Sequence, residues 1–130
     1  MTTFNDQDAV LFANAAFYRA VESLNGDLLE EILARHEPVR VVHPGWPLIS
    51  GRANVKASWE RIFDNAGVMQ FTIVDPEAHL DGDFAWVTCT EKLTSVQSGR
   101  VVEGLVATTN LFRRENGDWR IAHHHGSPVM

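Results

Sequence analysis

The hydrophobic residues in the first part of the chain repeat every three or four positions, the period of an amphipathic helix. This first stripe consists of Ala9, Phe12, Ala13, Ala16, Phe17, Ala20, Val21 and Leu24. Asn5 or Asp6 can cap the helix at its start, and Asn25-Gly26 ends it. The pattern predicts one long helix at the beginning of the chain.

Two shorter helices are predicted before residue 67. Asp27 and Glu30 have the spacing of a capping box for a helix over residues 28–34. A short strand follows at residues 39–43 and ends at Pro44. Ser50 is placed to cap a third helix, whose apolar face carries Val55, Trp59, Ile62 and Phe63.

After Gly67 the period changes to two, which is typical of strands. Four strands are predicted, at residues 69–80, 84–96, 101–114 and 119–127. The segments between them contain Asp-Gly or Asn-Gly pairs or Ser-Gly, which favour hairpin turns. Three helices followed by an antiparallel meander indicate an α+β domain. Three N-terminal helices packed on a strongly curved, mixed but mainly antiparallel sheet would enclose a cone-shaped pocket, which side chains or a ligand must fill.

Composition and charge narrow the class of protein. The 130 residues suit a single domain over 1–130. The formal net charge is −6, which argues against nucleic-acid and anionic-membrane partners because both require a basic surface. The N-terminal residues lack the pattern of a secretory peptide, and the one cysteine, Cys89, cannot form a disulfide within the chain. We expect a cytoplasmic protein without a cofactor.

Two segments resemble known families. Val41-Val42-His43-Pro44-Gly45-Trp46-Pro47-Leu48-Ile49-Ser50-Gly51 is similar to the strand, proline and glycine segment of ketosteroid isomerases. Residues 109–125, from Thr109-Asn110-Leu111-Phe112 to the three histidines, resemble the end of SnoaL-like polyketide cyclases and of kinase association domains. The chain is identified by these segments as a member of the nuclear-transport-factor-2-like superfamily, which contains both enzymes and assembly modules.

The resemblance implies site residues one position at a time. His43 stands where the isomerases have their aspartate base, and Asn110 where they have a protonated aspartate that donates to the oxyanion. The isomerases' tyrosine donor has no clear counterpart: Ala20 or Val21 falls near its position, and Tyr18 lies half a turn earlier. Steroid isomerisation is therefore not expected.

Side chains alternate between the two faces of a strand, so the resemblance also predicts which of them face the pocket. The predicted pocket residues are Tyr18, Trp46, Trp59, Trp86, Thr88, Thr90, Thr108, Asn110, Phe112, Ala122 and His124, with Lys92 as a further inward candidate. The opposite face would carry Val87, Cys89, Leu105, Ala107, Leu111, Trp119, Ile121, His123 and His125. Because that face is too apolar for solvent, a homodimer is expected to form through it.

The chemistry expected of the pocket is proton transfer next to a carbonyl group. An imidazole titrates near pH ~6.5, so His43 is the candidate general base and His124 a second acid or base. Asn110 and the indole of Trp59 could donate to an enolate oxygen. A small, mainly apolar molecule with one carbonyl or hydroxyl would fit, and the reaction would be an isomerisation, dehydration or cyclisation.

Each of these assignments has an alternative. His43, Asn110 and His124 could be hydrogen-bonded structural residues, and the tryptophans could be core. The whole chain could instead be a binding or assembly module, although the arginines of kinase association domains are replaced by Asn110, Gly126 and Lys92. His123 and His125 share a strand face and could both bind zinc, with His79, Glu91 or Glu103 as a third ligand, but no spacing selects one, so no metal site is predicted.

Overall fold

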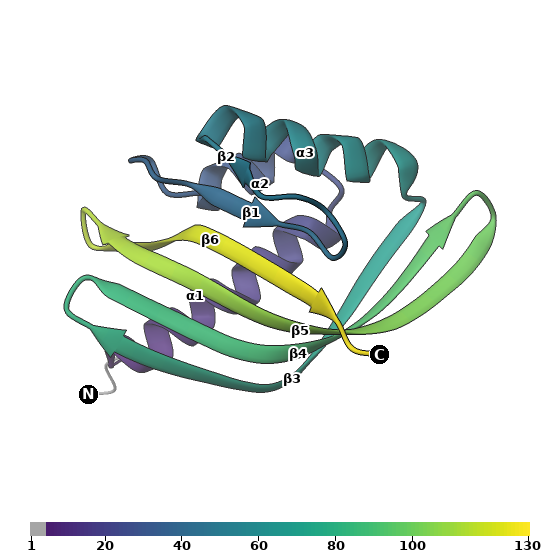
Figure 1. Cartoon of the computed structure of the whole chain (residues 1–130). Helices are drawn as coiled ribbons and strands as arrows, with labels where there is room; N and C mark the ends of the chain where they lie inside the picture. The colour runs from purple at the N-terminus through teal and green to yellow at the C-terminus, as the bar shows by residue number, and fades with distance from the viewer. Residues whose placement is uncertain (1–4) are drawn as a thin grey trace.

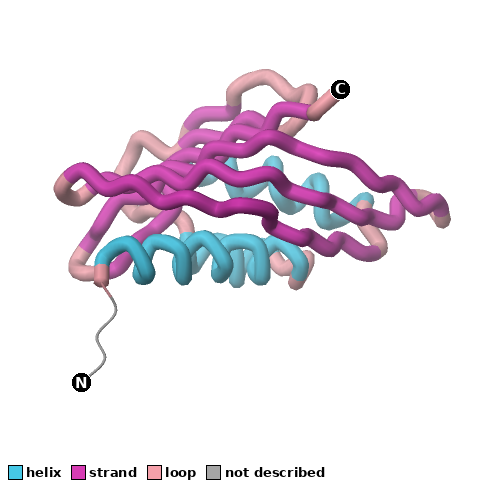
Figure 2. The backbone as a smooth tube through the Cα atoms, turned by 90° about the horizontal axis from the view of Figure 1, so that it is seen from below, coloured by secondary structure: helices cyan, strands magenta, loops and turns pink. Residues whose placement is uncertain are grey.

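The computed structural model describes residues 5–130, which form three helices and one six-stranded sheet. The strands lie in the order β2-β1-β6-β5-β4-β3, and all neighbours are antiparallel except β1 and β6, which are parallel. The sheet is curved, and the far end of the β4–β5 hairpin rises toward the side on which the helices lie (Figure 1). Figure 2 shows α1 against one face of the strands. The predicted α+β fold with a curved mixed sheet is confirmed.

The helices begin at capping residues close to those predicted. α1 spans Asp6–Glu22, and the side chain of its cap, Asn5, accepts a hydrogen bond from the Asp8 amide at 2.7 Å. α2 spans Gly26–Ile32, two residues earlier than predicted, because Asn25 rather than Asp27 caps it. α3 spans Arg52–Asn65 and starts after Gly51, which has a φ of 101° and no capping side chain. The expectation that Ser50 caps α3 was wrong.

The strands agree with the predicted meander within one or two residues. They are β1 (Arg40–Val42), β3 (Val68–Asp81), β4 (Phe84–Gln97), β5 (Arg100–Glu115) and β6 (Asp118–Pro128). A short strand that was not predicted, β2 (Ile49–Ser50), pairs with β1. Ser50, the residue expected to cap α3, is part of this strand instead.

The register of β4 against β5 corrects the predicted faces of β4. Val87 lies opposite Asn110 and Cys89 opposite Thr108. Opposed residues of an antiparallel pair point to the same side of the sheet. The inner face of β4 therefore carries the buried residues Ala85, Val87, Cys89 and Glu91, and the outer face carries Trp86, Thr88, Thr90 and Lys92. The prediction that these four face the pocket, and that Val87 and Cys89 face outward, was wrong.

A bulge in the β5–β6 pairing corrects a second orientation. Leu111 pairs with His123 but Phe112 pairs with Ile121, so Ala122 is an additional residue on β6. Ile121 and Ala122 are consequently both buried, at 2% and 8% exposure. Ile121 was predicted to face outward, and the bulge is the reason that it does not.

The core lies between the concave face of the sheet and the helices. α1 supplies Val10, Phe17 and Val21, and the central strands supply Val87 and Phe112. No helix within residues 5–130 is both long and apolar enough to cross a membrane.

Candidate functional site

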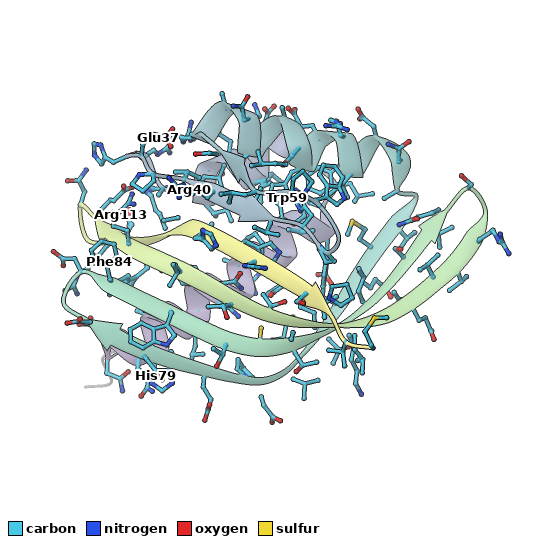
Figure 3. All side chains as sticks on the ribbon, in the orientation of Figure 1. Glu37, Arg40, Trp59, His79, Phe84 and Arg113 are labelled. Carbon is cyan, nitrogen blue, oxygen red and sulfur yellow. The ribbon has the colours of Figure 1, made fainter. Side chains whose placement is uncertain are left out.

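A cavity of about 210 Å³ opens between α1, α3 and the concave face of the sheet. Five aromatic side chains contribute to its wall, from α1, α3, β3 and the loop after β1. The lining residues are Phe17, Tyr18, Val21, His43, Pro44, Trp46, Trp59, Ile62, Met69, Phe71, Glu91, Leu93, Gln97 and His124. Figure 3 shows Trp59 beneath α3, on the side that faces the sheet. An apolar cavity with a few converging polar groups is typical of a small-molecule site.

His43 is held between two tryptophans and one serine. Its ring meets Trp46 edge-on at 4.8 Å and Trp59 at 4.5 Å between centroids, and only 1% of the residue is exposed. Nε2 lies 2.9 Å from the Ser58 hydroxyl, which itself donates to the Val55 carbonyl at 2.7 Å. A hydroxyl has one hydrogen to donate, so Nε2 must carry the proton and donate it to Ser58. Nδ1 is then the unprotonated nitrogen, which is the one able to accept a proton.

The second imidazole of the cavity has the opposite tautomer. His124 Nδ1 lies 2.6 Å from Asn110 Oδ1, an atom that only accepts, so Nδ1 carries the proton and Nε2 is unprotonated. His124 packs against Phe17 at 5.1 Å and against Trp59 at 5.6 Å. The two histidines therefore contact the same tryptophan, His124 from β6 and His43 from the loop after β1.

Burial keeps both imidazoles neutral at neutral pH. Loss of hydration lowers the pKa of His43 to about 4. It also lowers the pKa of His124 to about 3, with a smaller contribution from the nearby His43. The sequence predicts a base that titrates near neutrality, whereas the structure contains two imidazoles that stay unprotonated well below neutral pH.

Asn110 is the centre of a buried hydrogen-bond network. Its Nδ2 donates to Asn14 Oδ1 at 2.9 Å and to the Tyr18 hydroxyl at 3.2 Å, and its Oδ1 accepts from His124. Both amide hydrogens are used, and Asn110 does not line the cavity. In this arrangement it positions His124 and Tyr18 and has no free N–H for a ligand oxygen.

Tyr18 connects this network to a carboxyl group that was not predicted to belong to the site. Its hydroxyl donates to Glu91 Oε2 at 2.6 Å and lies 3.6 Å from Cys89 Sγ. Burial raises the pKa of Glu91, although the hydrogen bond from Tyr18 opposes the shift. Burial and the neighbouring carboxyl likewise raise the pKa of Tyr18, so the phenol remains a donor. Glu91 follows three buried residues at alternate positions of β4, and that alternation was the signal that could have identified it.

The structure therefore brings together only part of the predicted set. His43, His124, Tyr18, Trp46 and Trp59 line one cavity. The remaining residues are placed elsewhere: Thr108, Phe112 and Ala122 are buried on the inner side without lining it, and Trp86, Thr88 and Thr90 lie on the outer face.

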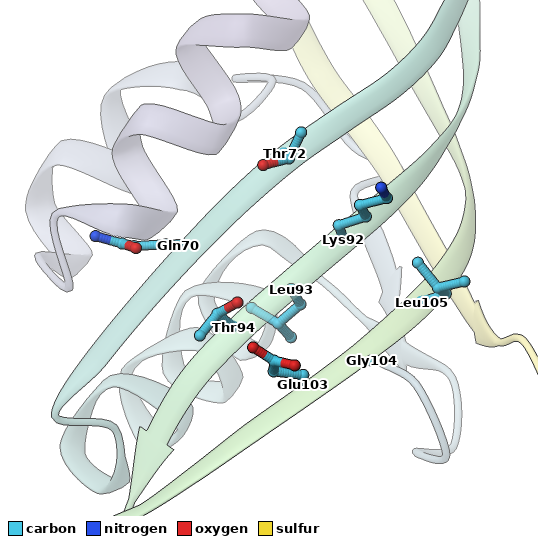
Figure 4. Close-up of a pocket in the computed structure, with 8 residues that line it drawn as sticks. All are labelled: Gln70, Thr72, Lys92, Leu93, Thr94, Glu103, Gly104 and Leu105. Atoms are coloured by element: carbon cyan, nitrogen blue, oxygen red, sulfur yellow. The ribbon is translucent and has the colours of Figure 1, made fainter.

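A larger hollow of about 440 Å³ lies on β3, β4 and β5, toward the far end of the β4–β5 hairpin (Figure 4). Its wall consists of Gln70, Thr72, Lys92, Leu93, Thr94, Glu103, Gly104 and Leu105. These residues come from β3, β4 and β5, and they include no histidine and no aromatic ring. Lys92, which was expected to face the pocket, belongs to this hollow instead.

The histidines of the outer face do not complete a metal site. The rings of His123 and His125 are 6.2 Å apart, whereas Glu91 lies on the inner face of β4 and His79 stacks on Trp86 at 5.4 Å. Within residues 5–130 no group of three or more histidine, cysteine, aspartate or glutamate side chains is arranged to hold an ion.

Solved structures with the same fold include a candidate enzyme and a candidate association domain. A candidate dehydratase of the NTF2-like family from Streptomyces avermitilis is 39% identical, with a TM-score of 0.90 over 96% of each chain. A candidate calcium/calmodulin-dependent protein kinase type II association domain from Thiobacillus denitrificans is 31% identical, with a TM-score of 0.77 over 91% of this chain and 93% of the other.

A curated plant protein also matches along most of the chain. The F-box protein SKIP8 of Arabidopsis thaliana is 25% identical over 122 residues, which are 94% of this chain. The chain spans 50% of that protein's length. The profile of the SnoaL-like domain matches residues 10–130. The protein thus belongs to the SnoaL-like domain family, within the nuclear-transport-factor-2-like superfamily.

Proposed function

We propose that the protein binds a small, mainly apolar carbonyl compound in the cavity beneath α3 and that His43 removes a proton from the carbon next to the carbonyl. The observation that carries this proposal is the fixed tautomer of His43. Its Nε2–H is held by Ser58, so the lone pair of Nδ1 belongs to a buried, neutral base. A general base needs a lone pair and a pocket in which a ligand can reach it.

The remaining polar groups of the cavity support a reaction without a cofactor. The indole N–H of Trp59 is a donor at the cavity wall, whereas the hydroxyl hydrogen of Tyr18 is already donated to Glu91. A donor placed at the ligand's oxygen would stabilise the enolate that forms when the proton leaves. The reaction class is proton abstraction, which leads to isomerisation, dehydration or cyclisation.

The test is solvent-deuterium exchange at the α carbon of 1-phenylbutan-1-one, a ketone with an apolar ring, followed by NMR in D₂O. The wild-type protein should accelerate exchange, and His43→Gln should lower the rate by a factor of about 10² or more, as for a lost general base. His125→Gln, on the outer face, is the matched control and should exchange at the wild-type rate. The rate should also stay constant from pH 8 down to about pH 5, since the pKa of His43 is about 4. Equal exchange by wild type and His43→Gln would refute the proposal.

We also propose that the outer face of the sheet joins two copies of the chain. Trp86 and Leu111 lie opposite each other on this face and are 37% and 38% exposed, and Leu105, six residues before Leu111 on the same face of β5, is 43% exposed. A row of large apolar side chains on an open sheet face suits a two-fold contact in which the same residues meet. The names of the relatives, an association domain and a kinase hub from S. rosetta at 23% identity, are consistent with assembly in this fold.

Light scattering tests this contact. The wild-type protein should have twice the mass of one chain, and Leu111→Glu should lower it to that of one chain. Val101→Glu, at the tip of the β4–β5 hairpin, should leave the dimer intact. A wild-type monomer at micromolar concentration would contradict the proposed contact. A dimer that shows no ketone exchange would favour the assembly-module alternative.

A further inference from the structure

One ionisable group of the cavity has no part in the reaction proposed above. Glu91 lies on the inner face of β4 and is 3% exposed, yet it lines the cavity. Tyr18 donates to its Oε2 at 2.6 Å, and Asn110 in turn donates to Tyr18 at 3.2 Å. The carboxyl group is therefore held in place from the α1 side by a chain of hydrogen bonds.

Glu91 and His43 approach the cavity from different parts of the sheet. His43 follows β1, whereas Glu91 lies on β4, and β6 and β5 run between them. Three strand spacings correspond to about 14 Å along the sheet. Because both residues line the same cavity, a ligand that fills it has the imidazole on one side and the carboxyl on the other.

No cation of the cavity wall neutralises this carboxyl. The described lining contains neither lysine nor arginine, and the neighbours of Glu91 there include Phe71 and Leu93. Removal from water among such side chains raises the pKa of Glu91. A protonated carboxyl group has an O–H to donate, so it can act as an acid toward a ligand oxygen.

We propose that Glu91 is the acid of this site, that it protonates an oxygen leaving the β carbon, and that the substrates are β-hydroxy carbonyl compounds, an inference that rests on His43 acting as the base. His43 Nδ1 takes the α proton, and the electrons of the C–H bond form the carbon–carbon double bond. The bond from the β carbon to oxygen breaks, and the departing oxygen takes the proton of Glu91. One water leaves with the α,β-unsaturated carbonyl product. The imidazolium then returns its proton, through solvent, to the carboxylate.

Two ketones distinguish the proposed role of Glu91 from the proposed role of His43. 1-Phenylbutan-1-one has no hydroxyl and reports only α-proton exchange. 3-Hydroxy-1-phenylbutan-1-one can also lose water, and its enone product is followed by its ultraviolet absorbance. Glu91→Gln keeps the size of the side chain and an acceptor for Tyr18 but has no acidic proton. Glu103→Gln, on an exposed part of β5, is the control.

Glu91→Gln should lose water from the hydroxyketone at a rate lower by about 10² or more, and its rate of exchange with the simple ketone should fall by a much smaller factor. Glu91→Asp, which restores the acid with a shorter reach, should recover part of the rate. His43→Gln should lose both reactions, and Glu103→Gln neither. The infrared spectrum of the wild-type protein at neutral pH should contain a protonated-carboxyl band that Glu91→Gln lacks.

Each other outcome overturns a specific part of the proposal. If Glu91→Gln dehydrates the hydroxyketone at the wild-type rate, or if it loses exchange and dehydration equally, Glu91 is not the acid. A wild-type protein that exchanges the simple ketone but does not dehydrate the hydroxyketone contradicts the substrate class and leaves the role of His43 intact. If the infrared band is absent, Glu91 is ionised and cannot donate. A wild-type protein that does not exchange the simple ketone fails at the proposed function itself.

Discussion

Replacement of His43 should make the protein more tolerant of mild acid. The imidazole is 1% exposed and has a pKa of about 4, compared with about 6.5 in an unfolded chain. Between these two values the unfolded state binds a proton that the folded state does not, so the free energy of unfolding falls as the pH is lowered. Integrated from pH 7 to pH 5, this difference costs the folded protein about 2 kcal/mol.

His43→Gln removes this titration and keeps a side chain that can donate to Ser58. Urea unfolding at pH 7 and pH 5 should therefore show a decrease in stability that is smaller in the variant by about 2 kcal/mol. His124 and Glu91 titrate in both proteins, and their contributions largely cancel in the comparison. Ser58→Ala is the control: it should lower stability at both pH values and keep the wild-type pH dependence, because His43 remains buried and titratable. If His43→Gln loses as much stability as wild type, His43 is not the buried neutral base described above.

Three further substitutions test packing and buried hydrogen bonds, each by its free energy of unfolding in urea. Gly126→Ala should cost about 1–3 kcal/mol, since the added carbon would lie 2.9 Å from Val106 Cγ1 and 3.2 Å from Pro44 Cγ; a cost near zero would show that these neighbours can move. Asn110→Ala should cost about 3 kcal/mol because it removes one hydrogen bond from each of three buried side-chain partners, and a neutral result would refute the network. Glu115→Ala should cost about 2 kcal/mol, since this buried carboxylate accepts two backbone N–H groups at 2.7 and 3.1 Å, and Glu115→Gln should recover part of the loss.

Most of the fold could be predicted from the chain because its periods are local. The change from a helical period to alternation after Gly67 located the three helices and the four long strands. The short strand β2 could not be predicted in this way, since two residues contain no period. Its existence depends on pairing with β1, which is a contact between distant parts of the chain.

The site was predicted in part, and the errors have one physical origin. His43, His124 and Trp59 line one cavity, as expected, because their positions depend on the end of one strand, on a second strand and on one helix face. The face of β4 depends on its register with β5, and a shift by one residue exchanges the two faces of a strand. The predicted register was wrong by one residue. Trp86 was therefore expected to face the pocket although it lies on the outer face, and Glu91, which lines the cavity, was not identified.

Hydrogen-bond partners were the other feature that the sequence could not provide. Asn110 was assigned a free N–H for a ligand, but Asn14 and Tyr18 of α1 use both of its amide hydrogens. The hydrogen bond of His43 to Ser58 likewise joins the loop after β1 to α3. Such pairs appear only once helices and sheet have packed together.

Nitrogen-15 NMR of the histidine side chains, with and without bound ketone, tests the central claim most directly. At neutral pH the imidazole of His43 should be neutral, with its proton on Nε2, and the Nδ1 resonance should shift when 1-phenylbutan-1-one enters the cavity. A proton on Nδ1, a charged ring, or an Nδ1 signal that the ketone leaves unchanged would contradict the assignment of this nitrogen as the base.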